Sequence, residues 1–117
     1  STIAFEQRAI HYFEFWSESK VTEDFQIKCL VVKLSGEISG TSSSMQVELD
    51  NGAEKVINRM ADYFTSGNEQ GLLAIENPYM VSRTLYAKWL GATLLCAMQK
   101  DRTHLEQAMT ETKLLIK

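Results

Sequence analysis

The chain has few residues that interrupt helices, with one proline and six glycines among 117 residues. Because these two residue types mark turns and strand ends, their scarcity favours long helices over many short strands. The longest stretch without a charged side chain, Trp89 to Gln99, is too short to span a bilayer. No positively charged segment precedes an apolar stretch at the start, so no secretory signal is expected.

The chain also lacks an excess of positive charge, since 12 Lys and Arg stand against 15 Asp and Glu, for a net charge of -3. A domain that binds DNA through its own surface normally carries a basic patch, so direct DNA binding is not expected. The only cysteines, Cys29 and Cys96, show no paired spacing. We therefore expect reduced thiols in a cytoplasmic protein.

No catalytic or metal-binding constellation is present. His11 and His104 are isolated, and neither has a cysteine or carboxylate at the spacing of a metal ligand. The serines at 42–44 have no matching base, and no glycine-rich phosphate loop follows a strand. The sequence predicts no metal ion, no cofactor and no enzymatic activity.

The apolar residues that are present recur at helical spacing. They predict a single all-α domain over residues 1–117, large enough for a core without disulfides. Within the second expected helix, the β-branched content of 30–34 would also suit a strand. Five helices are expected, at 2–17, between 24 and 38, from the serines at 42–44 to Gly67, from Pro78 to about 100, and from Thr103 to 116.

Three boundaries carry local signals. Asn77 followed by Pro78 predicts a helix start, because asparagine caps and proline suits the first helical position. Thr103 with Glu106 matches a capping box for the last helix. Gly67 is expected to close the third helix.

The helix from Pro78 is apolar on nearly every side, and such a helix must be covered all round. With four other helices in the chain, a partner subunit is the natural cover. The last helix carries a second apolar stripe. We expect a homodimer whose interface contains Ala87, Gly91, Leu94, Leu95, Met98, Met109, Thr112 and Ile116.

Aromatic residues from several helices either fill the core or line a ligand pocket. Tyrosine and tryptophan bring polar atoms that need partners when buried, which suits an apolar pocket with a few polar groups. Cys29 lies between Lys28 and Lys33, and a nearby cation raises thiolate content. Its alternative role is that of a small buried hydrophobe, as expected for Cys96. The candidate ligand-binding residues are Phe13, Trp16, Cys29, Lys33, Tyr63, Tyr86 and Trp89.

Several short motifs stand in order along the chain: Cys29-Leu30, Lys33-Leu34-Ser35 with Glu37, Ser44-Met45, Asn51-Gly52-Ala53, and Leu85-Tyr86-Ala87-Lys88-Trp89-Leu90-Gly91-Ala92. Together they resemble the effector domain of the TetR family, and the likeness covers most of the chain from Phe13 to Ile116. Within that family, the chain is most similar to the N-ethylmaleimide- and electrophile-responsive repressors.

The resemblance implies the ligand-binding and dimerisation domain of a homodimeric repressor. Its last two long helices would form a four-helix bundle across the dimer. Operator DNA would be bound only through an amino-terminal helix-turn-helix domain, absent from a chain that opens at Ser1. A small aromatic or electrophilic molecule would release the DNA. Redox-sensing members tend to carry further cysteines where this chain reads Ile38-Ser39-Gly40, so thiol sensing would depend on Cys29 alone.

Two other functions are compatible with the same residues. A helical dimerisation module with a filled core would need no ligand. A small helical enzyme acting on an apolar substrate would need a nucleophile, base or metal set that the sequence does not offer.

Overall fold

The structure is a computed structural model that describes residues 2–19 and 43–116. The described residues form four helices and no strand, which confirms the prediction of an all-α fold. The helix expected between residues 24 and 38 lies outside the described residues. The four helices are α1 (Thr2–Ser19), α3 (Ser43–Glu69), α4 (Pro78–Gln99) and α5 (Thr103–Leu115).

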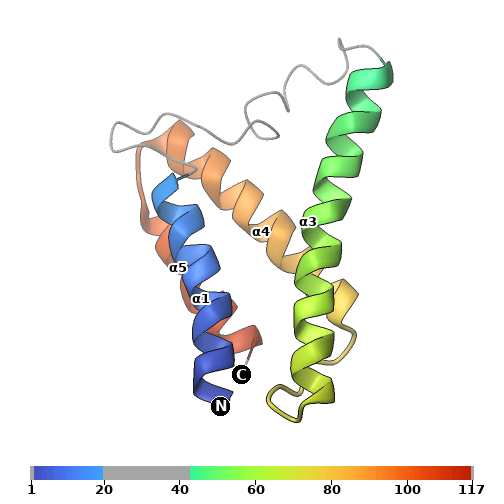
Figure 1. Cartoon of the computed structure of the whole chain (residues 1–117). Coiled ribbons are helices and arrows are strands. Elements are labelled where there is room, and N and C mark those ends of the chain that lie inside the picture. The colour runs from blue at the N-terminus through green and yellow to red at the C-terminus, as the bar shows by residue number, and fades with distance from the viewer. Residues whose placement is uncertain (1, 20–42, 117) are drawn as a thin grey trace.

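Helix α4 lies at the centre and packs against both α3 and α5, while α1 packs along α5. In Figure 1, α1 and α5 run in opposite directions, so α1 begins and α5 ends at the same end of the molecule. Helix α3 forms the opposite edge. The domain is flat, measuring 45 × 32 × 17 Å. None of the four described helices combines the length and hydrophobicity that crossing a bilayer requires.

The core forms where the other three helices meet α4. Each helix contributes at least one wholly buried large side chain, and burial of one such apolar side chain stabilises the fold by about 1.5–3 kcal/mol. The largest of these are Phe13, Phe64, Leu85, Trp89, Leu105 and Ile116.

The predicted start of α4 is confirmed. Asn77 adopts a left-handed conformation with φ 45°, and its side-chain oxygen accepts the N–H of Met80 at 3.3 Å. Pro78 occupies the first turn, where its missing N–H leaves no hydrogen bond unmade. At the other end, Lys100 is left-handed with φ 52° and donates its N–H to the carbonyl of Cys96.

The predicted end of α3 at Gly67 is wrong. Gly67 is buried inside the helix, which continues to Glu69. Its carbonyl instead accepts the N–H groups of Leu72 and Leu73, at 2.9 and 3.1 Å, as the chain turns away. The turn is made at Gly71, whose φ of 72° favours glycine.

The connection from α3 to α4 is held by one side chain. Asn68 donates from Nδ2 to the carbonyl of Ile75 at 2.8 Å, and its Oδ1 accepts the Ile75 N–H at 2.9 Å. These paired hydrogen bonds close the loop against the end of α3.

The capping box predicted at Thr103 is also wrong. Oδ1 of Asp101 accepts both the N–H of Thr103, at 2.9 Å, and its hydroxyl, at 2.7 Å. The Thr103 hydroxyl therefore bonds backwards along the chain, and the capping position, Arg102, makes no side-chain capping hydrogen bond.

Candidate functional site

A cavity of about 300 Å³ lies between α1 and α3. Its floor is apolar and buried, and its rim is exposed and basic. Among the described residues that line it, two are arginines and none is acidic. The lining consists of Arg8, Ala9, Tyr12 and Phe13 from α1, and of Val56, Arg59, Met60, Tyr63 and Phe64 from α3.

Tyr63 supplies a polar group to this cavity. Burial raises the pKa of its hydroxyl, and the positive charge of Arg8 on the other helix acts in the opposite direction. The net shift is upward, so the hydroxyl remains protonated at neutral pH and can donate a hydrogen bond. The influence of Arg8 on Tyr63 also indicates that these two groups approach each other across the cavity.

Other predicted pocket residues pack against one another beside the cavity. The rings of Phe13 and Trp89 are stacked, with centroids 4.9 Å apart and an interplanar angle of 18°. Trp16 meets Tyr86 edge-on at 5.9 Å and lies 6.2 Å from Trp89. Of the predicted ligand-binding residues, Phe13 and Tyr63 therefore line the cavity. Trp16, Tyr86 and Trp89 form an aromatic layer in contact with Phe13 or with each other.

The two remaining predicted ligand-binding residues, Cys29 and Lys33, lie outside the described residues. Cys96, expected in the core, is wholly buried. Burial raises the pKa of the Cys96 thiol.

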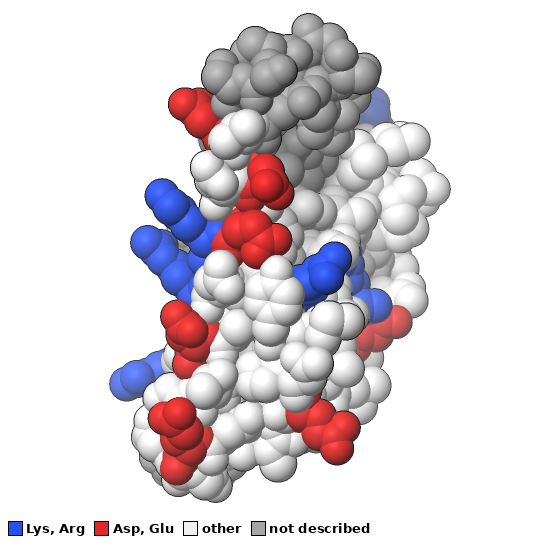
Figure 2. All heavy atoms as spheres, turned by 90° about the vertical axis from the view of Figure 1, so that its right-hand side faces the viewer, with Lys and Arg blue, Asp and Glu red and all other residues white. Residues whose placement is uncertain are grey.

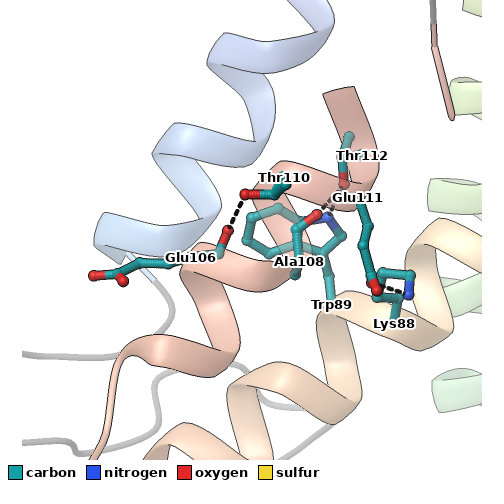
Figure 3. A network of polar contacts seen from close by, with 7 residues as sticks. All are labelled: Lys88, Trp89, Glu106, Ala108, Thr110, Glu111 and Thr112. Carbon is teal, nitrogen blue, oxygen red and sulfur yellow. Dashed lines mark hydrogen bonds and ion pairs between the residues drawn. The ribbon is translucent and has the colours of Figure 1, made fainter. Parts of the chain in front are cut away.

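Both indole groups of this layer are hydrogen-bonded to threonines. Trp89 donates from Nε1 to Oγ1 of Thr112 at 2.9 Å, and that hydroxyl donates to the carbonyl of Ala108 at 2.7 Å (Figure 3). Trp16 donates to Oγ1 of Thr93 at 2.9 Å, and Thr93 donates to the Trp89 carbonyl at 2.7 Å. Helices α1, α4 and α5 are thus joined by buried polar contacts.

A second candidate surface is the outer face of α4 and α5. It exposes large apolar side chains, with Met98 68% and Leu114 66% accessible. Leu94, Leu95 and Leu115 are also exposed there. Large apolar side chains exposed together on one pair of helices are a candidate interaction site.

The predicted interface residues divide between this face and the core. Ala87 and Gly91 lie with Leu95 along a shallow hollow of about 220 Å³ between α4 and α5. Thr112 and Ile116 are buried within the chain itself and have no surface left to offer a partner.

Two further side chains complete the description of the α4–α5 face. Met109, also predicted at the interface, is partly buried and packs on the core. Lys88 and Glu111 form an ion pair that joins α4 to α5 beside the hollow (Figure 3).

Sequence reasoning missed seven of the nine cavity residues: Arg8, Ala9, Tyr12, Val56, Arg59, Met60 and Phe64. A signal exists for Arg8, Tyr12 and Arg59, because each arginine stands four residues before a tyrosine, and residues four apart share a helix face.

The charge distribution gives no sign of a DNA-binding surface on the face that carries α3. Figure 2 shows acidic and basic side chains interleaved there. Within residues 2–19 and 43–116, no group of three or more His, Cys, Asp or Glu side chains gathers in a way that could hold a metal ion.

The chain is similar in sequence to the HTH-type transcriptional repressor NemR of Escherichia coli K12. The two are 35% identical over 89 residues, which cover 75% of this chain and 45% of NemR. The match to NemR of E. coli strain CFT073 has the same values. The chain thus spans less than half the length of the curated relatives it matches. No protein-family model matches it.

The fold is also similar to solved structures. Reduced E. coli NemR superposes with a TM-score of 0.85 at 30% identity, covering 97% of this chain and 58% of NemR. A transcriptional regulator of the TetR/AcrR family superposes with a TM-score of 0.83 at 26% identity, covering 97% of this chain and 59% of the other. These proteins are named as transcriptional regulators, in agreement with the prediction that the chain is not an enzyme.

Proposed function

Because this chain belongs to the TetR family of transcriptional regulators, as its sequence motifs predicted, we propose that it is the effector-sensing and dimerisation domain of a cytoplasmic repressor. A small aromatic or electrophilic molecule binds in the domain and causes release of operator DNA. The DNA itself is bound by a separate helix-turn-helix domain. The net charge of -3 supports this division of labour.

The observation that carries the proposal is the position of Phe13, which lines the cavity and also stacks on Trp89 of α4. An effector in the cavity contacts Phe13, and a shift of this ring displaces Trp89. Since Trp89 is hydrogen-bonded to Thr112, the shift extends to α5. A small change in the α4–α5 pair alters the spacing of two DNA-binding domains, which must match half-sites about one DNA turn apart.

In this proposal, Phe13 and Tyr63 contact the effector, and Trp16, Tyr86 and Trp89 form the layer behind them. Cys29 and Lys33 remain predicted members of the site: the thiol would react with an electrophile, and the ammonium would supply positive charge.

The proposed homodimer uses the exposed face of α4 and α5, whose two copies form a four-helix bundle. Within the chain, a Cβ atom added at Gly91 would meet no heavy atom within 4 Å. A side chain that begins at this position enters the hollow between α4 and α5, so a larger residue there is expected to disturb a partner more than the single subunit. Gly52, an exposed glycine of α3, also has no atom within 4 Å and supplies a matched control.

Sedimentation of the full-length protein tests this assembly. Gly91→Leu should shift the equilibrium towards monomer and weaken operator binding, whereas Gly52→Leu should leave both unchanged. A wild-type monomer at micromolar concentration, or a Gly91→Leu dimer as stable as wild type, would contradict the proposed interface.

A second candidate function is a dimerisation module without an effector, which the close stacking of Phe13 on Trp89 favours. Thermal denaturation separates the two. An effector at a hundredfold excess over its dissociation constant should add about 2.7 kcal/mol of stability. If no small aromatic or electrophilic compound raises the melting temperature, the dimerisation module is the better description.

A further inference from the structure

The two walls of the α1–α3 cavity carry the same pattern of side chains. Arg8–Phe13 on α1 and Arg59–Phe64 on α3 both read Arg-x-x-x-Tyr-Phe. The arginine, the tyrosine and the phenylalanine of each segment line the cavity. In both segments the phenylalanine is buried and the arginine is exposed, so each wall has an apolar base and a cationic rim.

The two segments run in opposite directions along the cavity, because α1 and α3 are antiparallel in Figure 1. Because both segments line the same cavity, the arginine end of each lies nearer to the tyrosine end of the other than it would in a parallel pair. The effect of the Arg8 charge on the Tyr63 hydroxyl agrees with this arrangement. The guanidinium of Arg8 and the phenolic O–H of Tyr63 thus belong to one end of the cavity but to different helices, and both are hydrogen-bond donors.

Neither arginine at the rim forms an ion pair with another described residue. The one ion pair within residues 2–19 and 43–116 joins Lys88 and Glu111, on the α4–α5 face. No acidic residue is among the described residues that line the cavity. A negatively charged ligand would form ion pairs with these two arginines.

We propose that the α1–α3 cavity binds a small aromatic carboxylate. The carboxylate is held at the rim by Arg8 and Arg59 with the Tyr63 hydroxyl, and the aromatic ring rests on the partly accessible side chains of Val56 and Met60, above the buried Phe13 and Phe64. The volume of about 300 Å³ lies at the lower end of the range for small-molecule sites, which suits one or two fused rings. The inference names the ligand class of the effector site, and it rests on the proposed function only for the release of DNA.

A pair of isosteric probes tests the charge requirement. The full-length protein is titrated by calorimetry with 2-naphthoate and with neutral 2-naphthamide. Because hydrogen bonds to a charged group are stronger than neutral ones, naphthoate should bind about tenfold more tightly or better. Equal affinity for the two probes would overturn the proposal.

Charge-removing variants then locate the carboxylate. The double variant Arg8→Met, Arg59→Met keeps unbranched apolar side chains and should abolish the preference for naphthoate. Arg83→Met removes the same kind of charge from the exposed surface of α4, outside the cavity lining, and should keep the preference. An equal loss in Arg83→Met would mean that the preference reflects overall charge, and would overturn the assignment.

Methyl-¹³C methionine spectra report the position of the aromatic ring. Met60 lines the cavity, whereas Met98 is exposed on α4. Naphthoate should shift the Met60 signal and leave Met98 in place. A shift of Met98 without Met60 would place the ligand on the α4–α5 face and overturn the proposal.

Operator binding separates this inference from the proposed function. If naphthoate shows the expected charge preference but leaves the protein–DNA complex intact, the anion site stands and its effector role fails. If instead a neutral aromatic releases DNA equally well from wild type and from the double arginine variant, the effector role stands and the anion site fails.

Discussion

Trp89 donates its indole N–H to the hydroxyl of Thr112, 2.9 Å away, and so joins α4 to α5 inside the core. The Thr112 hydroxyl in turn donates a hydrogen bond to the carbonyl of Ala108, one turn earlier in α5. Both groups are therefore satisfied without water, and removal of the Thr112 hydroxyl would leave the buried Trp89 N–H without this acceptor.

Replacing Thr112 by valine should destabilise the chain by about 1–3 kcal/mol, because it leaves the Trp89 N–H buried without an acceptor. Thr110 is an exposed residue of α5 that bonds to the carbonyl of Glu106 (Figure 3). Thr110→Val should change stability by no more than about 0.5 kcal/mol. Urea unfolding of the two variants checks the difference, and a Thr112→Val protein as stable as wild type would rule out the buried hydrogen bond.

The cap of α4 gives a second prediction. Asn77→Ala removes the acceptor for the Met80 N–H and places a Cβ-bearing residue without a polar side chain at φ 45°. The expected cost is about 1–2 kcal/mol. Asn77→Gly tolerates the left-handed backbone and should cost only a few tenths of a kcal/mol. A denaturant midpoint that is highest for wild type, slightly lower for Asn77→Gly and lowest for Asn77→Ala would support the cap. Equal losses for both variants would contradict it.

Cys96 should resist alkylation in the folded chain, since it is wholly buried and burial raises the pKa of its thiol. In a Cys29→Ser variant it is the remaining cysteine. N-ethylmaleimide should then react on the order of a hundredfold more slowly with native than with urea-unfolded protein. Mass spectrometry over time measures both rates. Similar rates in the two states would show that Cys96 is accessible.

The Lys88–Glu111 pair predicts a dependence of stability on pH. The hydrogen bond from Lys88 lowers the pKa of the Glu111 carboxyl below its ordinary value. The unfolded carboxyl binds a proton more readily than the folded one, so the contribution is present above an unfolded pKa of about 4.3 and is lost as pH falls through the folded pKa.

The matched variant is Glu111→Gln, which has nearly the same shape and no charge. Its stability should fall short of wild type at neutral pH by a small amount that shrinks in high salt, since both side chains are partly exposed. The difference should shrink as the pH falls from neutral and vanish once the carboxyl is protonated in the folded chain as well. Urea midpoints measured across this range check the prediction, and a difference that persists in acid would assign it to packing.

The helices were largely predictable because their signals are local. The spacing of Ala9, Phe13 and Trp16 predicts one buried face of α1. The two adjacent residues Asn77 and Pro78 mark the start of α4. The wrong boundary at Gly67 has a tertiary cause. Gly67 is buried, and burial outweighs the low helix propensity of glycine.

The candidate sites were harder to predict because their residues are far apart in sequence. An apolar stripe indicates that a helix face is covered, but it does not say which element covers it. Thr112 was therefore expected at a partner subunit, and it lies instead against Trp89 of the same chain. The pairing of Trp16 with Thr93 spans 77 residues, and only the packing of α1 on the other helices brings them together. Arg8 and Arg59 look like ordinary solvated charges until both helices are in place.

The two hydrogen bonds between Asn68 and Ile75 fix one end of α3 beside the start of α4. Helix α3 has 27 residues, so it extends about 40 Å from that fixed end. A tilt of α3 by about 5° about Asn68 would therefore move Ser43, at the other end of the helix, by roughly 3.3 Å, whereas the residues beside Asn68 would hardly move.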